Sequence, residues 1–461
     1  MTGKRKKARL LSRLALAMLA GSAIVTPAGA QSLQDALTQT YLNNPTLQSQ
    51  RAALRATDEN VAQALSGWRP TVTVNGSIGQ EYSDRQTPLT RIDDQTAQPR
   101  SLSMTLSQPV FNGFRTVNQT AAAEAQVKAA RARVESTEQQ VLLQAVTAYM
   151  DVVRDQAVLE LSQNNEQVLR RQLEATNDRF RVGEVTRTDV AQAEARLAGA
   201  IAARIRATGA LISSRANYQR VVGDMPGTLE KPPPLPAMPR TEDEALSKAL
   251  GGNPDLMVAQ FAEEAARYDV EVAVGNLLPS VSLDAQHARN RDVGTQDSRA
   301  ETTSIVARVS VPLYQSGAEY SQIRQRKETA SQRRIDIEDI RRQVRQITVR
   351  AWEALTTATA AIEARREQAR ATMIAFEGVS QEAEVGARTV LDVLDAEQER
   401  LDAQVRVVEA ERDRYVAAFT VLQAMGELTA TRLALPVQVF DPTEHYNRVR
   451  WQHFGTTPRG E

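Results

Sequence analysis

The stretch EVGARTVLDVLDAEQERL, from Glu384 to Leu401, decides the fold class of this chain. On a helix, its charged residues would share one face and its apolar residues would share the opposite face. The charged set is Arg388, Asp392, Asp395 and Glu399, and the apolar set is Val390, Leu394 and Leu401. A proline-free run of about 70 residues precedes this stretch, and Gly386 lies where the chain could turn back. The pattern predicts the tip of a very long helical hairpin.

The chain carries an earlier copy of the same pattern, RVGEVTRTDVAQAEARL, from Arg181 to Leu197. Gly183 and Asp189 precede Gly386 and Asp392 by the same number of residues. Farther from the tips, the segment around Asn44-Pro45 returns around Asn253-Pro254, and the pair Pro70 and Pro279 keeps that second offset. A register that stays constant over such a distance indicates an internal duplication.

Each half contains alternating apolar and polar residues, which predict β-strands. The first half alternates around Val72 to Ile78 and again around Leu102 to Leu106, which predicts a hairpin over about residues 70–110. The second half alternates around Val281 to Ala285 and around Ile305 to Val311, which predicts a hairpin over about residues 279–312. The polar segments Ser83 to Pro99 and Arg289 to Ala300 are expected to be connections, and His287 is expected on or beside a strand.

These strands can reach the length of about 9 to 11 residues that crosses a bilayer at a tilt. A soluble hairpin resting on helices is the alternative, and the aromatic residues near the strand ends favour the membrane: Trp68, Phe111, Phe114 and Tyr314. Four strands cannot close a barrel, because the smallest spanning barrels use eight. Strands shared by two chains would make eight, and strands shared by three would make twelve with a wide lumen.

The remaining segments complete the predicted organisation. Residues 1–30 combine basic residues, a short apolar run and Ala28-Gly29-Ala30, as in a cleaved signal peptide. The first repeat covers 31–230, with a long helical hairpin over about 115–222, and the second covers 241–430, with its hairpin over about 318–425. A proline-rich linker, KPPPLPAMPR, occupies 231–240. Residues 431–461 are expected to be a docked irregular segment or a disordered tail.

Composition excludes several classes of protein. The chain balances 56 Lys and Arg against 56 Asp and Glu, and removal of the six basic residues in 1–30 would leave an acidic protein, so no nucleic-acid partner is expected. It has no cysteine, which excludes disulfides and thiolate metal sites. His287, His445 and His453 are scattered, and no nucleotide-binding or hydrolase motif occurs, so we expect neither a metal site nor a cofactor nor an enzyme.

Taken in order, the predicted segments resemble the TolC family of bacterial outer-membrane efflux proteins over nearly all of residues 31–425. The marks of the resemblance are the two NP-x-L segments at Asn44 and Asn253, SQPVFNG and SVPLYQSG after the hairpins, and VGARTVLDVLDAEQ. The resemblance implies a mostly α fold with a small β part, four strands per chain in a trimeric 12-stranded outer-membrane barrel, and a long periplasmic helical barrel. It also implies a periplasmic adaptor and an inner-membrane ABC or RND-type transporter as partners, with drugs or secreted proteins as cargo.

The resemblance assigns Asp392 and Asp395 to acidic rings that constrict the periplasmic end, and Arg388 to a constraining basic residue. An ordinary solvated helix face is the alternative for these charges. The resemblance also implies a tyrosine that helps to hold the closed state in family members of the best-studied type, and Ala383 stands at its position here.

Two further positions are assigned from the turns themselves. Val182-Gly183 and Val385-Gly386 would contact the adaptor, because glycine lets a partner approach the backbone closely. A simple glycine cap is the alternative at both positions. For the whole chain, the competing function is a periplasmic coiled-coil scaffold that forms no pore.

Overall fold

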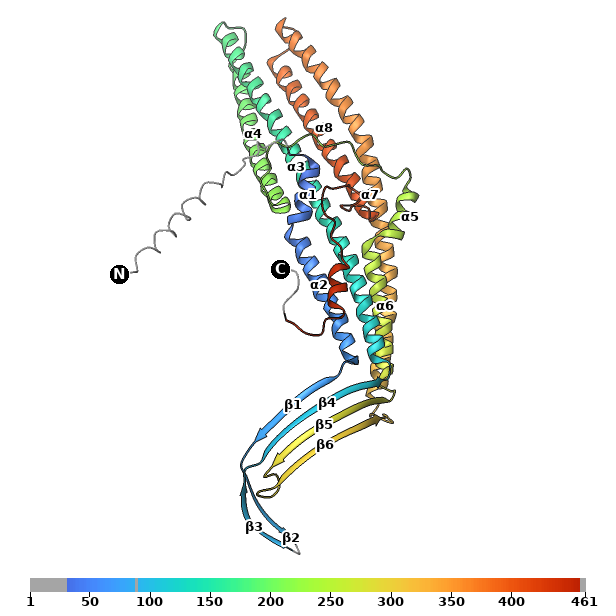
Figure 1. Ribbon diagram of the computed structural model, residues 1–461. Helices are drawn as coiled ribbons and strands as arrows, with labels where there is room; N and C mark the ends of the chain where they lie inside the picture. Colours follow the sequence, from blue (N-terminus) through green and yellow to red (C-terminus); the bar gives the residue numbers. More distant parts are fainter. Residues whose placement is uncertain (1–30, 88–89, 457–461) are drawn as a thin grey trace, which may run out of the picture. The chain divides into compact units, whose positions relative to one another are not determined.

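The computed structural model of the chain describes residues 31–87 and 90–456, and the predicted signal peptide lies outside them. Helices make up most of the described chain, and strands form a small part of it (Figure 1). The mostly α fold with a small β part, predicted from the sequence, is confirmed. None of the helices in the described part is both long enough and apolar enough to cross a membrane.

Two helical hairpins dominate the fold. The first joins α3 (Arg115–Arg181) to α4 (Arg187–Val222), and the second joins α7 (Ala318–Glu384) to α8 (Val390–Ala424). Both α3 and α7 contain 67 residues, so the duplication inferred from the sequence is matched by helices of equal length. Their freedom from proline and their many alanines explain why they continue without a break.

Shorter helices precede each pair of strands. These are α1 (Leu33–Asn43), α2 (Pro45–Leu65) and the 3-10 turn η1 (Ser66–Trp68) in the first half, and α5 (Glu242–Gly252) and α6 (Pro254–Gly275) in the second. The amide oxygen of Asn44 accepts hydrogen bonds from the backbone N–H groups of Thr46 and Leu47, at 3.0 and 3.4 Å. Asn253 caps α6 in the same way, at 3.0 Å from the N–H of Asp255. Asn-Pro therefore ends one helix and starts the next in both halves.

The chain folds into two compact units. The first contains residues 31–40, 145–235 and 366–412, and therefore both hairpin tips. The second contains 41–87, 90–144, 236–365 and 413–456, and therefore all the strands. Each unit takes parts of both predicted repeats, so the division in space is not the division along the sequence.

In the second unit, four strands form one antiparallel sheet in the order β1-β4-β5-β6 (Figure 1). They are β1 (Thr71–Ile78), β4 (Arg100–Asn112), β5 (Ser280–Arg291) and β6 (Arg299–Ser310). The register places Val74, Met104, His287 and Thr303 in one row across the sheet. Because side chains alternate between faces, most of the large apolar residues of the four strands lie on one face, and Val306 of β6 lies on the other.

The structure corrects the sequence prediction for both connections in the sheet. The segment Ser83 to Pro99, expected to be a loop, contains two further strands, β2 (Glu81–Thr87) and β3 (Thr90–Ala97), which pair with each other. The second connection is shorter than the predicted Arg289 to Ala300, since β5 runs to Arg291 and β6 begins at Arg299. The sequences of β2 and β3 carry no apolar alternation, so the pattern used to find strands misses them.

The C-terminal segment, through residue 456, is docked in the second unit and contains α9 (Glu444–Val449). Its hydrogen bonds reach α1, α2 and α3. The N–H of Phe440 donates to the hydroxyl of Tyr41 at 3.0 Å, the imidazole of His445 lies 3.0 Å from the buried carboxylate of Asp58, and the Arg450 guanidinium donates to Glu124 at 2.9 Å. Burial raises the pKa of Asp58, and the hydrogen bond to His445 opposes that rise. The docked alternative for this segment is therefore the one observed.

A substitution at Gly426 would test how closely the end of α8 must approach the turn between α5 and α6. Its φ is +78°, and a Cβ there would overlap the carbonyl oxygen of Gly252 and lie 2.9 Å from the carbonyl carbon. We expect Gly426→Ala to cost about 2 kcal/mol or more and to lower the thermal unfolding midpoint by roughly 2 to 3 °C, measured by circular dichroism in detergent.

Gly209→Ala is the control, because Gly209 lies within α4 and a Cβ at this position would meet no atom within 4 Å. Alanine is the better helix former, so this variant should unfold at the same temperature or slightly higher. Equal midpoints for Gly426→Ala and the parent protein would contradict the close approach.

Candidate functional site

The two hairpin tips, residues 182–186 and 385–389, have the same backbone geometry. Gly183 and Gly386 have φ values of +80° and +79°. The N–H of Gly183 donates to Phe180 O at 3.0 Å, and that of Gly386 donates to Ala383 O at 3.2 Å. A Cβ at either glycine would meet no atom within 4 Å, so glycine is required here by the backbone conformation and not by crowding.

Each tip leads into a capping box at the start of the returning helix. The hydroxyl of Thr389 accepts from the N–H of Asp392 at 3.2 Å, while the Asp392 carboxylate accepts from the N–H and the hydroxyl of Thr389 at 2.9 and 2.8 Å. Thr186 and Asp189 make the same three contacts in the first hairpin. The aspartates of the two copies therefore have one local role, which is to start a helix.

This geometry corrects the expectation that Arg388 and Asp392 share a helical face. The helix α8 begins only at Val390, so Arg388 lies in the turn. Its Nε lies 2.8 Å from Glu382 Oε2, at the end of α7. The pair holds the pKa of the Arg388 guanidinium above its ordinary value, mainly through the hydrogen bond to Glu382, with a smaller contribution from the charge of Asp392.

The pKa of Asp392 is lowered, first by the backbone hydrogen bond from Thr389, then by its hydroxyl, and to a smaller extent by the charge of Arg388. The cap contact therefore stabilises the tip fully above the ordinary aspartate pKa, and the contribution is lost only as the pH falls through the lowered value. At neutral pH the carboxylate is ionised and already engaged by the turn.

Asp395 lies one turn farther along α8 and forms an ion pair with Arg196 of α4. This contact joins the second hairpin to the first within the same unit. Both side chains are partly exposed, 54% for Asp395 and 39% for Arg196, so the pair is worth at most about 1 kcal/mol. The sequence did not single out Arg196, because its partner is on the other hairpin and only the packing of the two copies brings them together.

An apolar cluster lies behind these charges. Leu169 of α3 and Ala193 and Ala200 of α4 pack with Val390 and Leu394 of α8. Val390 and Leu394 are 5% and 2% exposed, which agrees with the apolar face predicted for this stretch. Small alanines on α4 let the helices approach closely, and Leu394 fills the space between them.

A groove of about 460 Å³ lies between α3, α7 and α8 beside the second tip. Its wall contains Glu397, which is 1% exposed and holds Arg400 through two contacts of 2.6 and 2.8 Å. The Arg400 guanidinium also lies over the ring of Phe376, 5.1 Å from its centre. The charge of the Glu397 carboxylate is therefore balanced by the Arg400 guanidinium, and the pair has a structural role. Ala383, buried in the same wall, contributes no polar group.

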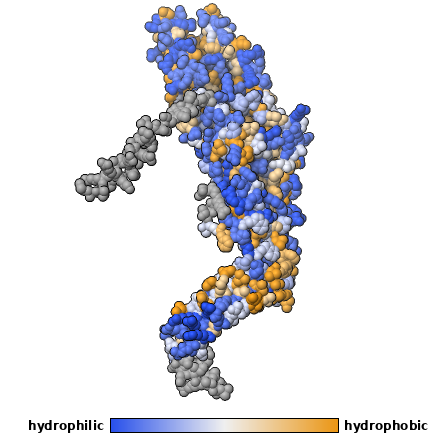
Figure 2. Space-filling view, in the orientation of Figure 1, coloured by the Kyte–Doolittle hydropathy of each residue, from blue (hydrophilic) through white to orange (hydrophobic). Residues whose placement is uncertain are grey.

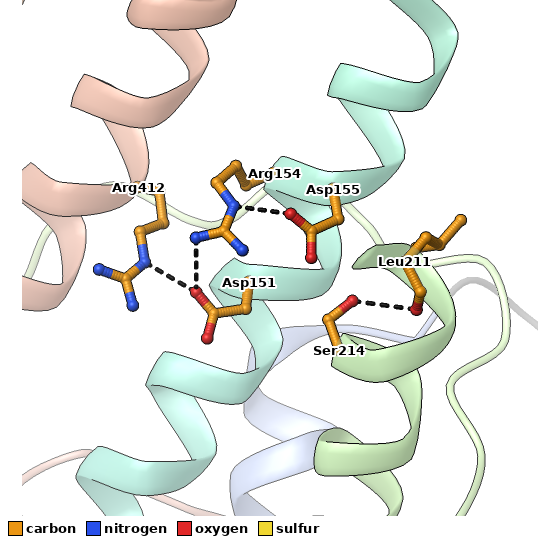
Figure 3. A network of polar contacts seen from close by, with 6 residues as sticks. All are labelled: Asp151, Arg154, Asp155, Leu211, Ser214 and Arg412. Carbon is orange, nitrogen blue, oxygen red and sulfur yellow. Dashed lines mark hydrogen bonds and ion pairs between the residues drawn. The ribbon is translucent and has the colours of Figure 1, made fainter. Parts of the chain in front are cut away.

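A second polar link between the hairpins lies farther from the tips (Figure 3). Arg412 of α8 lies 2.9 Å from Asp151 of α3, and Arg154 contacts Asp151 and Asp155 at 3.2 and 2.7 Å. The hydrogen bond to Asp155 is the main cause that raises the pKa of Arg154. Ser214 of α4 bonds only to its own helix in this view, at 3.0 Å from Leu211 O.

Each tip begins with an exposed apolar residue. Val182 and Val385 expose 72% and 82% of their surface. Neither valine is needed to form the turn, which the glycine hydrogen bonds already define. Among residues 31–87 and 90–456, no group of three or more histidine, aspartate or glutamate side chains is arranged to hold a metal ion.

Comparison with known proteins shows which family shares this architecture. The sequence profile described as "Outer membrane efflux protein" matches residues 36–224 and 245–427, which together make up most of the chain. The chain belongs to the outer membrane efflux protein family.

Individual relatives agree with the family match. The chain is 38% identical to the outer membrane efflux protein BepC of Brucella suis, over 97% of both chains, and 26% identical to the outer membrane protein TolC of Vibrio cholerae, over 87% of this chain and 92% of TolC. The outer membrane channel CmeC of Campylobacter jejuni has the same fold, with a TM-score of 0.78 over 91% of this chain and 89% of CmeC at 15% identity.

These matches confirm the TolC-type fold and the outer-membrane location predicted from the sequence. The family consists of outer-membrane channels, related to efflux and type I secretion proteins, and its members are not enzymes. The outer membrane efflux family therefore accounts for the long hairpins and the small sheet together.

The capping threonine provides a test of the tip geometry. Thr389→Ala removes the hydroxyl at the N-cap of α8, and the loss of such a cap costs about 1 kcal/mol. We expect backbone amides of residues 390–393 to exchange with deuterium about fivefold faster, measured by mass spectrometry.

Thr188→Ala is the matched control, because Thr188 lies just inside α4 and makes none of the cap contacts. Exchange in the first tip should be unchanged in both variants. Unchanged exchange at 390–393 in Thr389→Ala would show that the capping box does not hold this tip.

Proposed function

We propose that three copies of this chain form an outer-membrane channel-tunnel, which exports drugs or secreted proteins delivered by an inner-membrane pump and a periplasmic adaptor. The observation that carries the proposal is the sheet. Its edge strands β1 and β6 each have a neighbour on one side only among the described strands. Its apolar face is uncovered, with exposures of 40% to 76% at Val72, Val74, Ile78, Leu102, Met104, Leu283, Ile305 and Val309.

The open strand edges and the exposed apolar face are both unfavourable in a single chain. Assembly in a membrane would remove both costs. Open strand edges in hydrocarbon leave backbone groups unpaired at several kcal/mol each, so β1 of one copy must pair with β6 of another. Three copies supply twelve strands, enough for an open lumen, whereas eight strands would be filled by side chains. Trp68 and Tyr314, both exposed near the helical end of the strands, suit the membrane interface.

We assign the gate to the second tip, and the contacts of its residues refine the roles expected from the sequence. Asp392 and Asp395 would provide the acidic constriction in three copies, with Arg388 as a constraining charge. Arg388 is held by Glu382, and Asp395 by Arg196 of the same chain. Because Ala383 has no hydroxyl, we assign the restraint to these two ion pairs, which lie at the second tip together with the Arg179–Glu184 pair of the first.

The constriction can be tested by single-channel recording in planar bilayers. Asp392→Ala with Asp395→Ala removes six carboxylates from a trimer, so we expect the preference for cations to fall at least roughly twofold and block by divalent cations to weaken. Arg196→Gln should shift selectivity the opposite way, because it leaves Asp395 uncompensated.

Glu194→Gln is the control, since Glu194 is an exposed carboxylate on α4 without an ion pair in the described chain. Selectivity and divalent block that stay unchanged in the double variant would remove these aspartates from the pore.

We assign the adaptor contact to Val182, Gly183, Val385 and Gly386. The glycines are explained by the turn, whereas the two exposed valines have no role in the fold of the single chain. An exposed apolar side chain at each tip is a suitable anchor for a partner with a complementary apolar pocket.

Replacing both valines tests this contact. Val182→Asp with Val385→Asp should preserve trimer yield and reduce crosslinking to the purified adaptor at least roughly tenfold, since burial of a charge is costly in an apolar contact. Met225→Asp, at an exposed apolar residue away from the tips, should leave crosslinking at the parent level. Parent-level crosslinking in the valine variant would rule out this contact.

A further inference from the structure

The register of the sheet places three arginines side by side. Arg100 of β4 pairs with Arg291 of β5, and Arg291 pairs with Arg299 of β6. Ile78 of β1 completes the row. All three arginines are exposed, and the row lies at the end of the strands remote from α2 and α6. We call these three residues the arginine row.

The arginine row lies on the apolar face. In the same alternation, the next rows on that face contain Leu102, Arg289 and Glu301, then Met104, His287 and Thr303, and then Leu106, Ala285 and Ile305. The face thus changes from apolar to charged along the strands. In Figure 2 the visible surface of the sheet likewise changes from orange near the helices to blue toward its far end.

The row immediately below the arginine row is neutralised internally. Glu301 lies 3.0 Å from Arg289 and 3.5 Å from His287, so its carboxylate is already shared. Asp292, next to Arg291 in sequence, accepts a hydrogen bond from the N–H of Asp297 within the β5–β6 turn.

The arginine row itself has no such compensation. In the described part of the chain, Arg100 donates to the amide oxygen of Gln98 at 3.3 Å, and none of the three arginines forms an ion pair. Like charges opposite one another on adjacent strands are destabilising. An anion that bridges them would remove this repulsion and would be held by several guanidinium groups at once.

The position of the row indicates which anion. From Val281 to Arg291 the strand rises about 33 Å, or roughly 25 Å along the membrane normal at the usual barrel tilt. This is about the height of the apolar band of an outer-membrane barrel, so the arginines would reach the plane of the headgroups. This step rests on the proposed function, in which the apolar face contacts lipid.

We propose that the arginine row binds the phosphate groups of a phosphorylated lipid on the outward side of the membrane. A lipid suits the site better than a free phosphate ion, because its acyl chains would cover the exposed apolar rows below while its phosphates neutralise the guanidinium groups. Arginine binds such phosphates with two parallel N–H donors, which lysine cannot do.

Native mass spectrometry of the purified protein tests the proposal, with bis-phosphorylated lipid A and its dephosphorylated form as probes. The parent protein should retain the phosphorylated lipid preferentially. Arg100→Gln with Arg291→Gln and Arg299→Gln should weaken this binding by about a hundredfold, because each basic residue near an anionic surface contributes about fivefold. The triple lysine variant should retain intermediate binding, which separates loss of charge from loss of fold.

Arg324→Gln with Arg345→Gln and Arg350→Gln is the control, because these are three exposed arginines of α7 without ion pairs in the described chain. It should bind lipid like the parent. Equal binding of the two lipids by the parent, or full binding by the triple glutamine variant, would overturn the proposal. Displacement by inorganic phosphate at the concentration of the lipid would overturn the choice of a lipid.

Membrane fractionation and single-channel conductance of the same samples separate this inference from the proposed function. Normal channels without a preference for the phosphorylated lipid would refute the arginine row alone. A parent protein that neither fractionates with the outer membrane nor conducts would refute the proposed function itself.

Discussion

The requirement that every strand edge be paired governs the rest of this structure. A sheet of four strands ends at β1 and β6, and each of these strands leaves a row of backbone groups without a neighbour in the single chain. Water could satisfy those groups, but a bilayer cannot. In the proposed assembly, pairing between copies would satisfy the strand edges, and lipid would cover the exposed apolar face.

The two hairpin tips share one backbone geometry but differ in their charged residues. Both tips use a left-handed glycine followed by a Thr-Asp capping box, and their hydrogen bonds agree within a few tenths of an ångström. The charges around the two turns differ. Arg388 pairs back to Glu382 in one copy, whereas Arg179 pairs with Glu184 in the other, and Asp395 has Gln192 as its counterpart. The turn is thus preserved by local backbone needs, while the charges are free to take different partners.

The free energies of the individual contacts indicate what holds the hairpins together in the first unit. Full burial of a leucine such as Leu394 contributes roughly 2 kcal/mol, whereas an ion pair as exposed as Arg196–Asp395 contributes at most about 1 kcal/mol. The apolar cluster therefore supplies most of the attraction near the tips. The ion pairs set which faces meet, and they can be broken at small cost, as a gate that opens would require.

The sequence by itself determined the features that depend on neighbours along the chain. Glycine at a left-handed turn, Asn-Pro at a helix start and alternation on a half-apolar strand each act within a few residues, so their positions could be predicted. The tertiary structure alone decided what depends on distant segments: the pairing of Asp395 with Arg196, the burial of Glu397 and the alignment of Arg100, Arg291 and Arg299. It also revealed β2 and β3, whose sequences carry no apolar alternation. The physical reason is that charges and strands find partners through space, and one sequence does not state which of its many charged residues will be adjacent once the two copies pack.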